Sequence, residues 1–77
     1  MKKRSEFIEL HLACDDSYFN LKKDGKIILN KSFVVEAAEH KINGVEVTKI
    51  NVCKYGNCGY RTYHVSEKID EVMEMLS

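Results

Sequence analysis

Proline and tryptophan are both missing from this sequence of 77 residues, and aromatic side chains make up only 9% of it. Its longest apolar runs, such as residues 27–29 and 33–35, are far shorter than the roughly 20 residues that cross a bilayer. The 12 basic side chains are balanced by 12 acidic ones, so the chain has no overall attraction to phosphate backbones. We therefore expect no membrane span and no nucleic-acid binding driven by net charge.

Cysteine is also scarce, and its odd count of three indicates reduced thiols rather than a disulfide framework. The basic residues 2–4 are followed by Glu6 and Glu9 and not by the apolar core of a signal peptide. Both features predict a cytoplasmic protein. A chain of this length supports one hydrophobic core, so we expect a single domain over residues 1–77, with residues 1–5 flexible.

The first half of the chain carries the pattern of strands. Ile8, Leu10 and Leu12 alternate with polar residues, which predicts a half-buried strand. The pair Asp24-Gly25 predicts a hairpin between residues 18–23 and 26–30, because both positions of such a tight turn need positive φ. Apolar residues 27–29 then lie on both faces of the second strand, which predicts that it is covered on both sides.

A second pair, Asn43-Gly44, predicts a hairpin between residues 34–42 and 45–53. Residues 32–41 also contain good helix formers, and Ser32 could cap a helix. The apolar residues 33–35 and the Asn-Gly turn favour a short turn followed by a strand. A helix over residues 32–41 is the alternative.

A third hairpin is predicted around the loop between Cys53 and Cys58, in one of two registers whose opposed residue numbers sum to 111 or 113. Both registers give the same two faces. The predicted core face carries Ile50, Val52, Tyr63 and Val65, extended by Val35 and Ala37. The predicted outer face carries Lys49, Asn51, Cys53, Cys58, Tyr60, Thr62 and His64. His40 and His64 would flank Val47 at a distance of about 10 Å, too far apart to share one metal ion directly.

The end of the chain has the pattern of an amphipathic helix. Ile69, Val72, Met73 and Leu76 follow the i, i+3, i+4, i+7 spacing of one helical face, and Ser66 is a natural N-cap. The fold class that we predict is α+β, a small and mostly antiparallel meander of about five strands with this helix packed on it.

The chemistry-bearing residues do not form a catalytic pattern. A nucleophilic cysteine needs a nearby base, and Cys58 lies about 20 Å along the strand from His64. We expect no enzymatic activity and no cofactor. A fold without metal is preferred, and the alternative is a zinc module with the ligands Cys53, Cys58, His11 and Cys14.

The first functional alternative is a nucleic-acid-binding regulator, and the zinc module is the second. It would use the one concentrated group of basic side chains together with an aromatic neighbour, namely Lys22, Lys23, Lys26, Lys31 and Tyr18. The simpler interpretation of such a group is a solvated edge that opposes aggregation.

Two blocks resemble a known family. Residues 24–36, DGKIILNKSFVVE, resemble the NGKxFxLNPDxIExIE segment of small bacterial flagellar proteins of the FlbD type, called SwrD in some bacilli. Residues 63–72, YHVSEKIDEV, resemble the closing strand and helix of the same proteins, and similar patterns occur in small phage and mobile-element proteins. The resemblance implies a small β-rich module without enzymatic activity that acts through a partner.

The leading hypothesis is therefore a small accessory or regulatory module that binds a larger protein. It could be a host accessory protein or a phage-encoded inhibitor that occupies a surface of its partner, and a homodimer through an exposed sheet edge is an alternative arrangement. Exposed tyrosines are common interface anchors. The predicted contact residues are Tyr55, Tyr60, His64 and Lys49.

Overall fold

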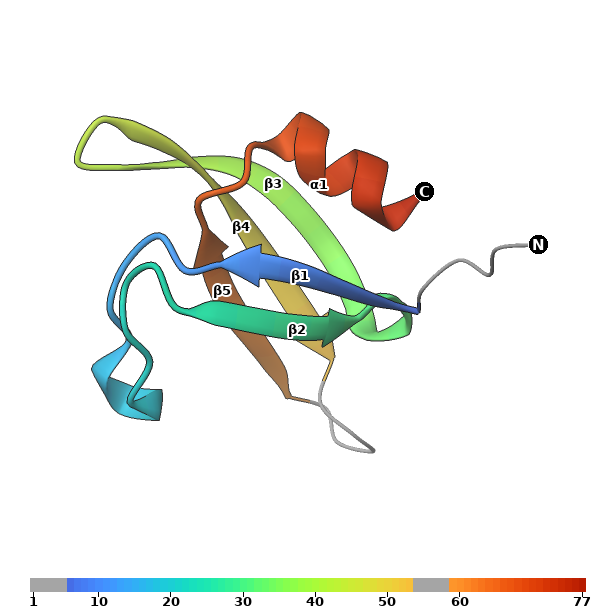
Figure 1. The fold of residues 1–77 in the computed structure, drawn as a ribbon, viewed down its shortest axis with the longest axis horizontal. Helices are drawn as coiled ribbons and strands as arrows, with labels where there is room; N and C mark the ends of the chain where they lie inside the picture. The colour runs from blue at the N-terminus through green and yellow to red at the C-terminus, as the bar shows by residue number, and fades with distance from the viewer. Residues whose placement is uncertain (1–5, 54–58) are drawn as a thin grey trace.

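The computed structural model describes residues 6–53 and 59–77 and has the predicted α+β fold, with two antiparallel sheets and one C-terminal helix (Figure 1). Strands β1 (Phe7–His11) and β2 (Lys26–Asn30) form the first sheet. Strands β3 (Val34–Ile42), β4 (Val45–Cys53) and β5 (Tyr60–Val65) form the second sheet in that order. Two single-turn 3-10 helices, η1 (Ser17–Phe19) and η2 (Lys31–Phe33), and the helix α1 (Ile69–Leu76) complete the fold.

The two sheets are joined where β1 ends. Leu12 forms an isolated bridge with Val65, and the backbone N–H of Ala13 donates to the carbonyl of His64 at 2.8 Å. The backbone N–H of Ser66 donates in turn to the carbonyl of His11 at 2.8 Å. The chain after β1 therefore continues along the edge of β5, and β1 and β2 cross in front of β4 and β5 (Figure 1).

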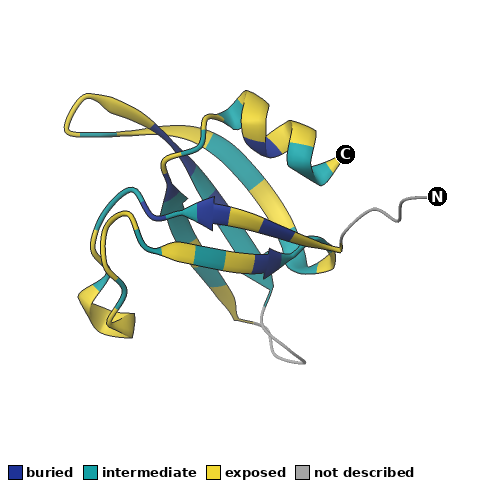
Figure 2. Cartoon of the chain, in the orientation of Figure 1, coloured by how far each residue is buried: buried dark blue, intermediate teal, exposed yellow. Residues whose placement is uncertain are grey.

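The hydrophobic core lies between the two sheets and α1. Its buried members come from both sheets and from the helix and are Ile8, Leu10, Leu29, Ile50, Val65 and Val72. We call the face of β3, β4 and β5 that contacts this core the inner face, and its opposite the outer face. Buried positions alternate with exposed ones along β1 (Figure 2), as the alternation of its sequence predicts. The helix packs against β3 and β4, and no helix in the described ranges is long and apolar enough to span a membrane.

The first predicted hairpin is wrong. Strand β2 pairs with β1 and not with residues 18–23. The reason is local, because residues 17–19 form η1, where the side chain of Asp16 accepts from the Phe19 N–H and Asn20 ends the turn with a φ of 57°. The predicted cover on both faces of β2 is also wrong, since Ile28 points outward and is exposed while Leu29 is buried.

The second hairpin is confirmed. Asn43 and Gly44 have φ values of 51° and 80° and join β3 to β4. Residues 32–41 form a turn followed by a strand, as preferred, and not the alternative helix. The predicted place of Val35 in the core is wrong, because a β-bulge makes it the extra residue between the Val34 and Glu36 pairs. Val34 packs against the core instead, and Val35 is 53% exposed.

The third pairing, between β4 and β5, follows the register whose numbers sum to 113, with Cys53 opposite Tyr60 and Asn51 opposite Thr62. The predicted faces hold, since Ile50 and Val65 are fully buried on the inner face. The loop that joins these strands lies outside the described residues, and so does Cys58.

The amphipathic helix is confirmed, with two corrections. Val72 is its buried centre, but Met73 is 60% exposed and Met75 packs against the core in its place. The predicted cap is also wrong, because the helix begins at Ile69, with Lys68 at the N-cap position. Ser66 is engaged elsewhere, since its N–H bonds to β1. The backbone N–H of Lys68 instead donates to the Glu71 carboxylate at 3.2 Å.

Candidate functional site

The helix η1 is a single turn that is held by its own loop. Asp16 and Leu21 exchange two backbone hydrogen bonds of 2.8 Å, which close residues 16–21 into a loop. Inside this loop the carboxylate of Asp16 accepts from the Phe19 N–H at 3.4 Å. The turn carries Tyr18 on its surface with 85% of the residue exposed. An aromatic side chain is therefore presented to solvent from a capped, closed loop.

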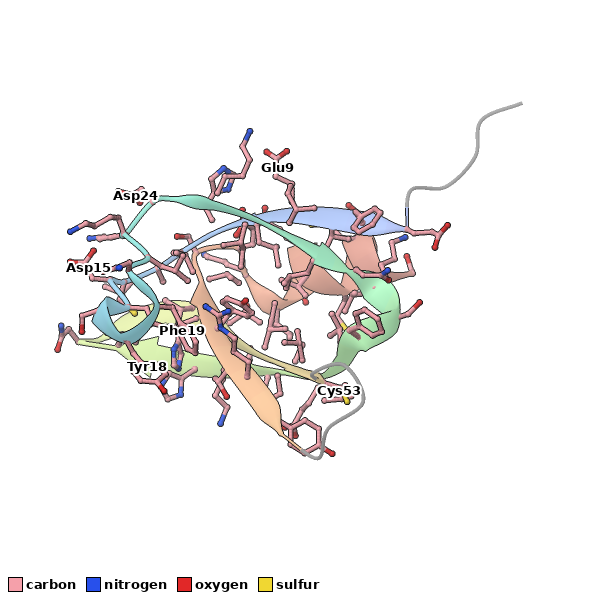
Figure 3. All side chains as sticks on the ribbon, turned by 90° about the horizontal axis from the view of Figure 1, so that it is seen from below. Glu9, Asp15, Tyr18, Phe19, Asp24 and Cys53 are labelled. Carbon is pink, nitrogen blue, oxygen red and sulfur yellow. The ribbon has the colours of Figure 1, made fainter. Side chains whose placement is uncertain are left out.

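The second aromatic residue of the turn is anchored to β5. The guanidinium carbon of Arg61 lies 3.5 Å from the ring centroid of Phe19 and 4.6 Å from that of Tyr63. Such cation–π contacts contribute about 0.5–1 kcal/mol each when partly exposed. Phe19 also meets Tyr18 edge to face, with ring centroids 4.6 Å apart. Arg61 thus ties η1 to β5, and Figure 3 shows Tyr18 and Phe19 beside that strand.

A groove of about 300 Å³ separates the loop of η1 from β5. Its lining includes Asp16 and Tyr18 on the loop and Thr62 and His64 on the strand. Tyr60 lies two residues before Thr62 on the same face of β5 and is 67% exposed. We call this region the η1–β5 surface, and it consists of Asp16, Tyr18, Phe19, Tyr60, Arg61, Thr62 and His64.

The outer face next to this surface is tied together by side chains. The hydroxyl of Thr62 donates to the amide oxygen of Asn51 at 2.7 Å. The amide nitrogen of Asn51 donates to the Glu36 carboxylate at 2.8 Å. This chain of bonds crosses all three strands of the sheet and fixes their outer side chains without burying them.

His40 and His64 meet on the outer face, although about 10 Å was expected between them. Their ring centroids are 5.1 Å apart. The expected value reflects the backbone spacing of two strands, whereas the imidazoles extend toward each other above β4. Burial lowers the pKa of His64, the neighbouring His40 and Lys49 lower it further, and Asp16 opposes them. His64 therefore favours its neutral form more than an ordinary histidine does.

His11 forms a separate pair with Glu67 on the other side of the β1–β5 junction. The Glu67 carboxylate accepts from the His11 backbone N–H at 2.9 Å and lies 2.7 Å from its Nδ1. Burial by itself raises the pKa of Glu67, but the hydrogen bonds from His11, together with smaller contributions from a further backbone hydrogen bond and from the electrostatics of His11, outweigh burial and the net shift is downward. The buried hydroxyl of Thr48 donates to the Glu67 carbonyl at 2.6 Å. Glu67 therefore joins β1, β4 and the start of α1.

Some of the residues that were predicted to bind a protein lie on or next to the η1–β5 surface. Tyr60 and His64 belong to the η1–β5 surface, and Lys49 pairs with His64 across the sheet. Tyr55 lies outside the described residues.

The predicted basic group is divided in space. Lys22, Lys23 and Lys26 surround the turn before β2, whereas Lys31 follows that strand, about 16 Å further along. Acidic groups lie among these lysines. The ammonium of Lys26 is 3.7 Å from the Glu9 carboxylate, and the Asp15 carboxylate accepts from the backbone N–H of Lys23 at 2.7 Å.

The alternative zinc ligands lie at two ends of the molecule. His11 and Cys14 are near the end of β5 at Val65, whereas Cys53 is opposite Tyr60 at the start of that strand, about 16 Å away. Figure 3 shows Cys53 far from Asp15, the neighbour of Cys14. Within residues 6–53 and 59–77, there is no group of three or more histidine, cysteine or acidic side chains that could hold a metal ion.

Four residues of the η1–β5 surface were not among the predicted contacts, namely Asp16, Phe19, Arg61 and Thr62, and Tyr18 was predicted only for the nucleic-acid alternative. A signal for the turn was present in the sequence, since Asp16 three residues before Phe19 and Asn20 just after it are typical of a capped, closed turn. The pairing of Arg61 with Phe19 spans 42 positions and depends on the β1–β5 junction, which no local pattern indicates. A comparison of the chain with protein-family models, curated proteins and solved structures gave no significant match. The resemblance to FlbD-type proteins therefore stays a prediction.

Proposed function

We propose that this protein is a small accessory or regulatory module that binds a larger protein through the η1–β5 surface and has no enzymatic activity of its own. The observation that carries the proposal is the presentation of Tyr18. This side chain is 85% exposed, yet its loop is closed by backbone bonds and its neighbour Phe19 is stacked on Arg61. An exposed aromatic on a prearranged turn loses little conformational entropy when a partner covers it.

The composition of the surface supports protein recognition. Tyrosine and arginine are enriched among the residues that dominate binding energy, and aromatic side chains bury a large area at interfaces. Tyr18 lines the groove from the loop of η1, and Thr62 and His64 line it from β5. A partner side chain entering the groove would contact the ring of Tyr18 and both polar groups.

Site-specific crosslinking in the cells of origin tests the proposal. A photoreactive benzoyl-phenylalanine would replace Tyr18 in one variant and Tyr60 in a second. Met73 is the control position, because it is also well exposed, at 60% against 67% for Tyr60, but lies on α1. We expect one larger protein to be crosslinked from positions 18 and 60 and not from position 73.

Two results would contradict the proposal. One is the same crosslinking pattern from all three positions, which would indicate contact without a defined surface. The other is crosslinking from position 73 alone, which would assign the interface to α1. The identity of the captured protein would also separate a flagellar partner from a host target of a phage protein.

The nucleic-acid alternative has less support, because Lys31 is separated from the other lysines and carboxylates lie beside Lys23 and Lys26. It predicts retention on a heparin column at low salt, with a steep loss as the salt concentration rises. We expect no retention, and retention that disappears in Lys22→Gln Lys23→Gln would favour the alternative.

A further inference from the structure

The two histidines on the outer face have the spacing of a pair of metal ligands. His40 on β3 and His64 on β5 have ring centroids 5.1 Å apart, with their planes tilted by 40°. A Zn–N bond of about 2.0–2.1 Å puts the ion about 3.2 Å from an imidazole centroid, so two rings on a tetrahedral ion have centroids about 5.2 Å apart. The observed centroid separation therefore matches the one that a shared tetrahedral ion requires.

The histidine pair has an apolar neighbour on β4. Val47 is opposite His40 on the strand between the two histidines and is only 6% exposed, so the base of the site is apolar. His40 itself is exposed, which leaves access from solvent. A metal ion binds the neutral form of an imidazole.

The charges near the pair act in opposite directions. Lys49 lies opposite His64 across the strand pair, and its positive charge would repel a cation. The negative charge of Asp16 also acts on His64, and it would attract a cation. A site with two protein ligands and a nearby lysine should bind weakly.

We propose that His40 and His64 together bind one divalent transition-metal ion of the zinc class, with water at its remaining positions. The ion would bridge β3 and β5 across β4 and so fasten the two outer strands of the sheet. This site shares no member with the cysteine-based zinc site considered from the sequence, and it does not depend on the proposed protein partner.

Zn²⁺ titration of the full-length reduced protein tests the site by NMR of the histidine rings. The ring resonances of His40 and His64 should shift together and saturate at one equivalent of bound ion. Those of His11 serve as an internal control, since its Nδ1 is engaged with Glu67. His40→Asn and His64→Asn should each weaken binding by about tenfold or more, because even loss of an outer partner of a metal ligand costs 10–100-fold.

A third variant tests the charge of the site rather than its ligands. Lys49→Gln should tighten Zn²⁺ binding by about two- to fivefold, because it removes a repelling surface charge. Binding that is unchanged in both His40→Asn and His64→Asn would overturn the proposal. So would Zn²⁺ binding that is lost in Cys53→Ser Cys58→Ser while the His40 and His64 ring resonances never shift, since it would assign the metal to the thiols.

Discussion

The inner and outer faces of the three-stranded sheet differ in what their side chains contact. On the inner face, Ile50 and Val65 are fully buried against β1, β2 and α1. On the outer face, neighbouring side chains contact each other across strands, as Thr62 does with Asn51. Alternation along a strand assigns its residues to these two faces in turn.

This difference separates stability from binding. Buried apolar side chains contribute to the free energy of unfolding, whereas exposed side chains that pair with each other contribute little. The outer face and the adjoining loop of η1 can therefore carry a binding surface without weakening the fold. Replacements on the two faces should therefore differ in their effect on stability.

The largest effect is expected for Ile50→Ala. Ile50 is fully buried at the centre of the core, so the truncation should reduce the free energy of unfolding by about 2–5 kcal/mol. Its neighbour on the outer face provides the control, and Asn51→Ala should cost less than about 1 kcal/mol. Urea unfolding followed by circular dichroism measures both. Equal losses would mean that the two faces do not differ as described.

A smaller effect is expected at the β-bulge, where neighbouring valines lie in different surroundings. Val34→Ala removes two methyl groups that pack against the core and should cost about 1–2 kcal/mol. Val35→Ala, at a residue that is 53% exposed, should change stability by less than about 0.5 kcal/mol. The same unfolding assay compares them. The reverse order would show that the strand is paired without the bulge.

Acid should reveal the contribution of Glu67. The pKa of Glu67 is lower in the folded chain than the ordinary value of 4.5. The ionised carboxylate therefore stabilises the folded state fully at pH values above 4.5. This stabilisation is lost as the pH falls through the lowered pKa of the folded state. Glu67→Gln should therefore be less stable than the parent by about 1 kcal/mol at neutral pH, and the gap should narrow below pH 4.5.

Thermal unfolding at a series of pH values measures this gap. Glu74→Gln is the matched control, because Glu74 is an exposed carboxylate on α1 for which stability should change little. A gap that is constant down to pH 3 would mean that ionised Glu67 does not stabilise the fold.

Much of the fold could be predicted because its signals are local. The Asn43-Gly44 turn, the alternation of Ile8 and Leu10, and the spacing of Ile69 and Val72 each depend on a few neighbouring residues. The shared faces of β4 and β5 also followed from alternation, since either register assigned the same residues to them.

The wrong predictions arose where a long-range contact competed with a local signal, because a local pattern does not show such contacts. Asp24-Gly25 has the composition of a hairpin turn, but η1 occupies the residues before it and β1 pairs with β2 instead. Ser66 has the composition of a cap, but β1 takes its backbone N–H. In the candidate site, Tyr60 and His64 were predicted from their face, whereas the stack of Arg61 on Phe19 required the long-range junction of β1 with β5.

The central claim is that Tyr18 and Tyr60 of the η1–β5 surface bind a partner and do not hold the fold together. The most direct test is the variant Tyr18→Ser Tyr60→Ser, measured both for its unfolding free energy and for its affinity for the protein crosslinked from position 18. We predict a change in stability of less than about 1 kcal/mol and a loss of affinity of at least about tenfold. Unchanged affinity, or a loss of stability comparable to that of Ile50→Ala, would contradict the account.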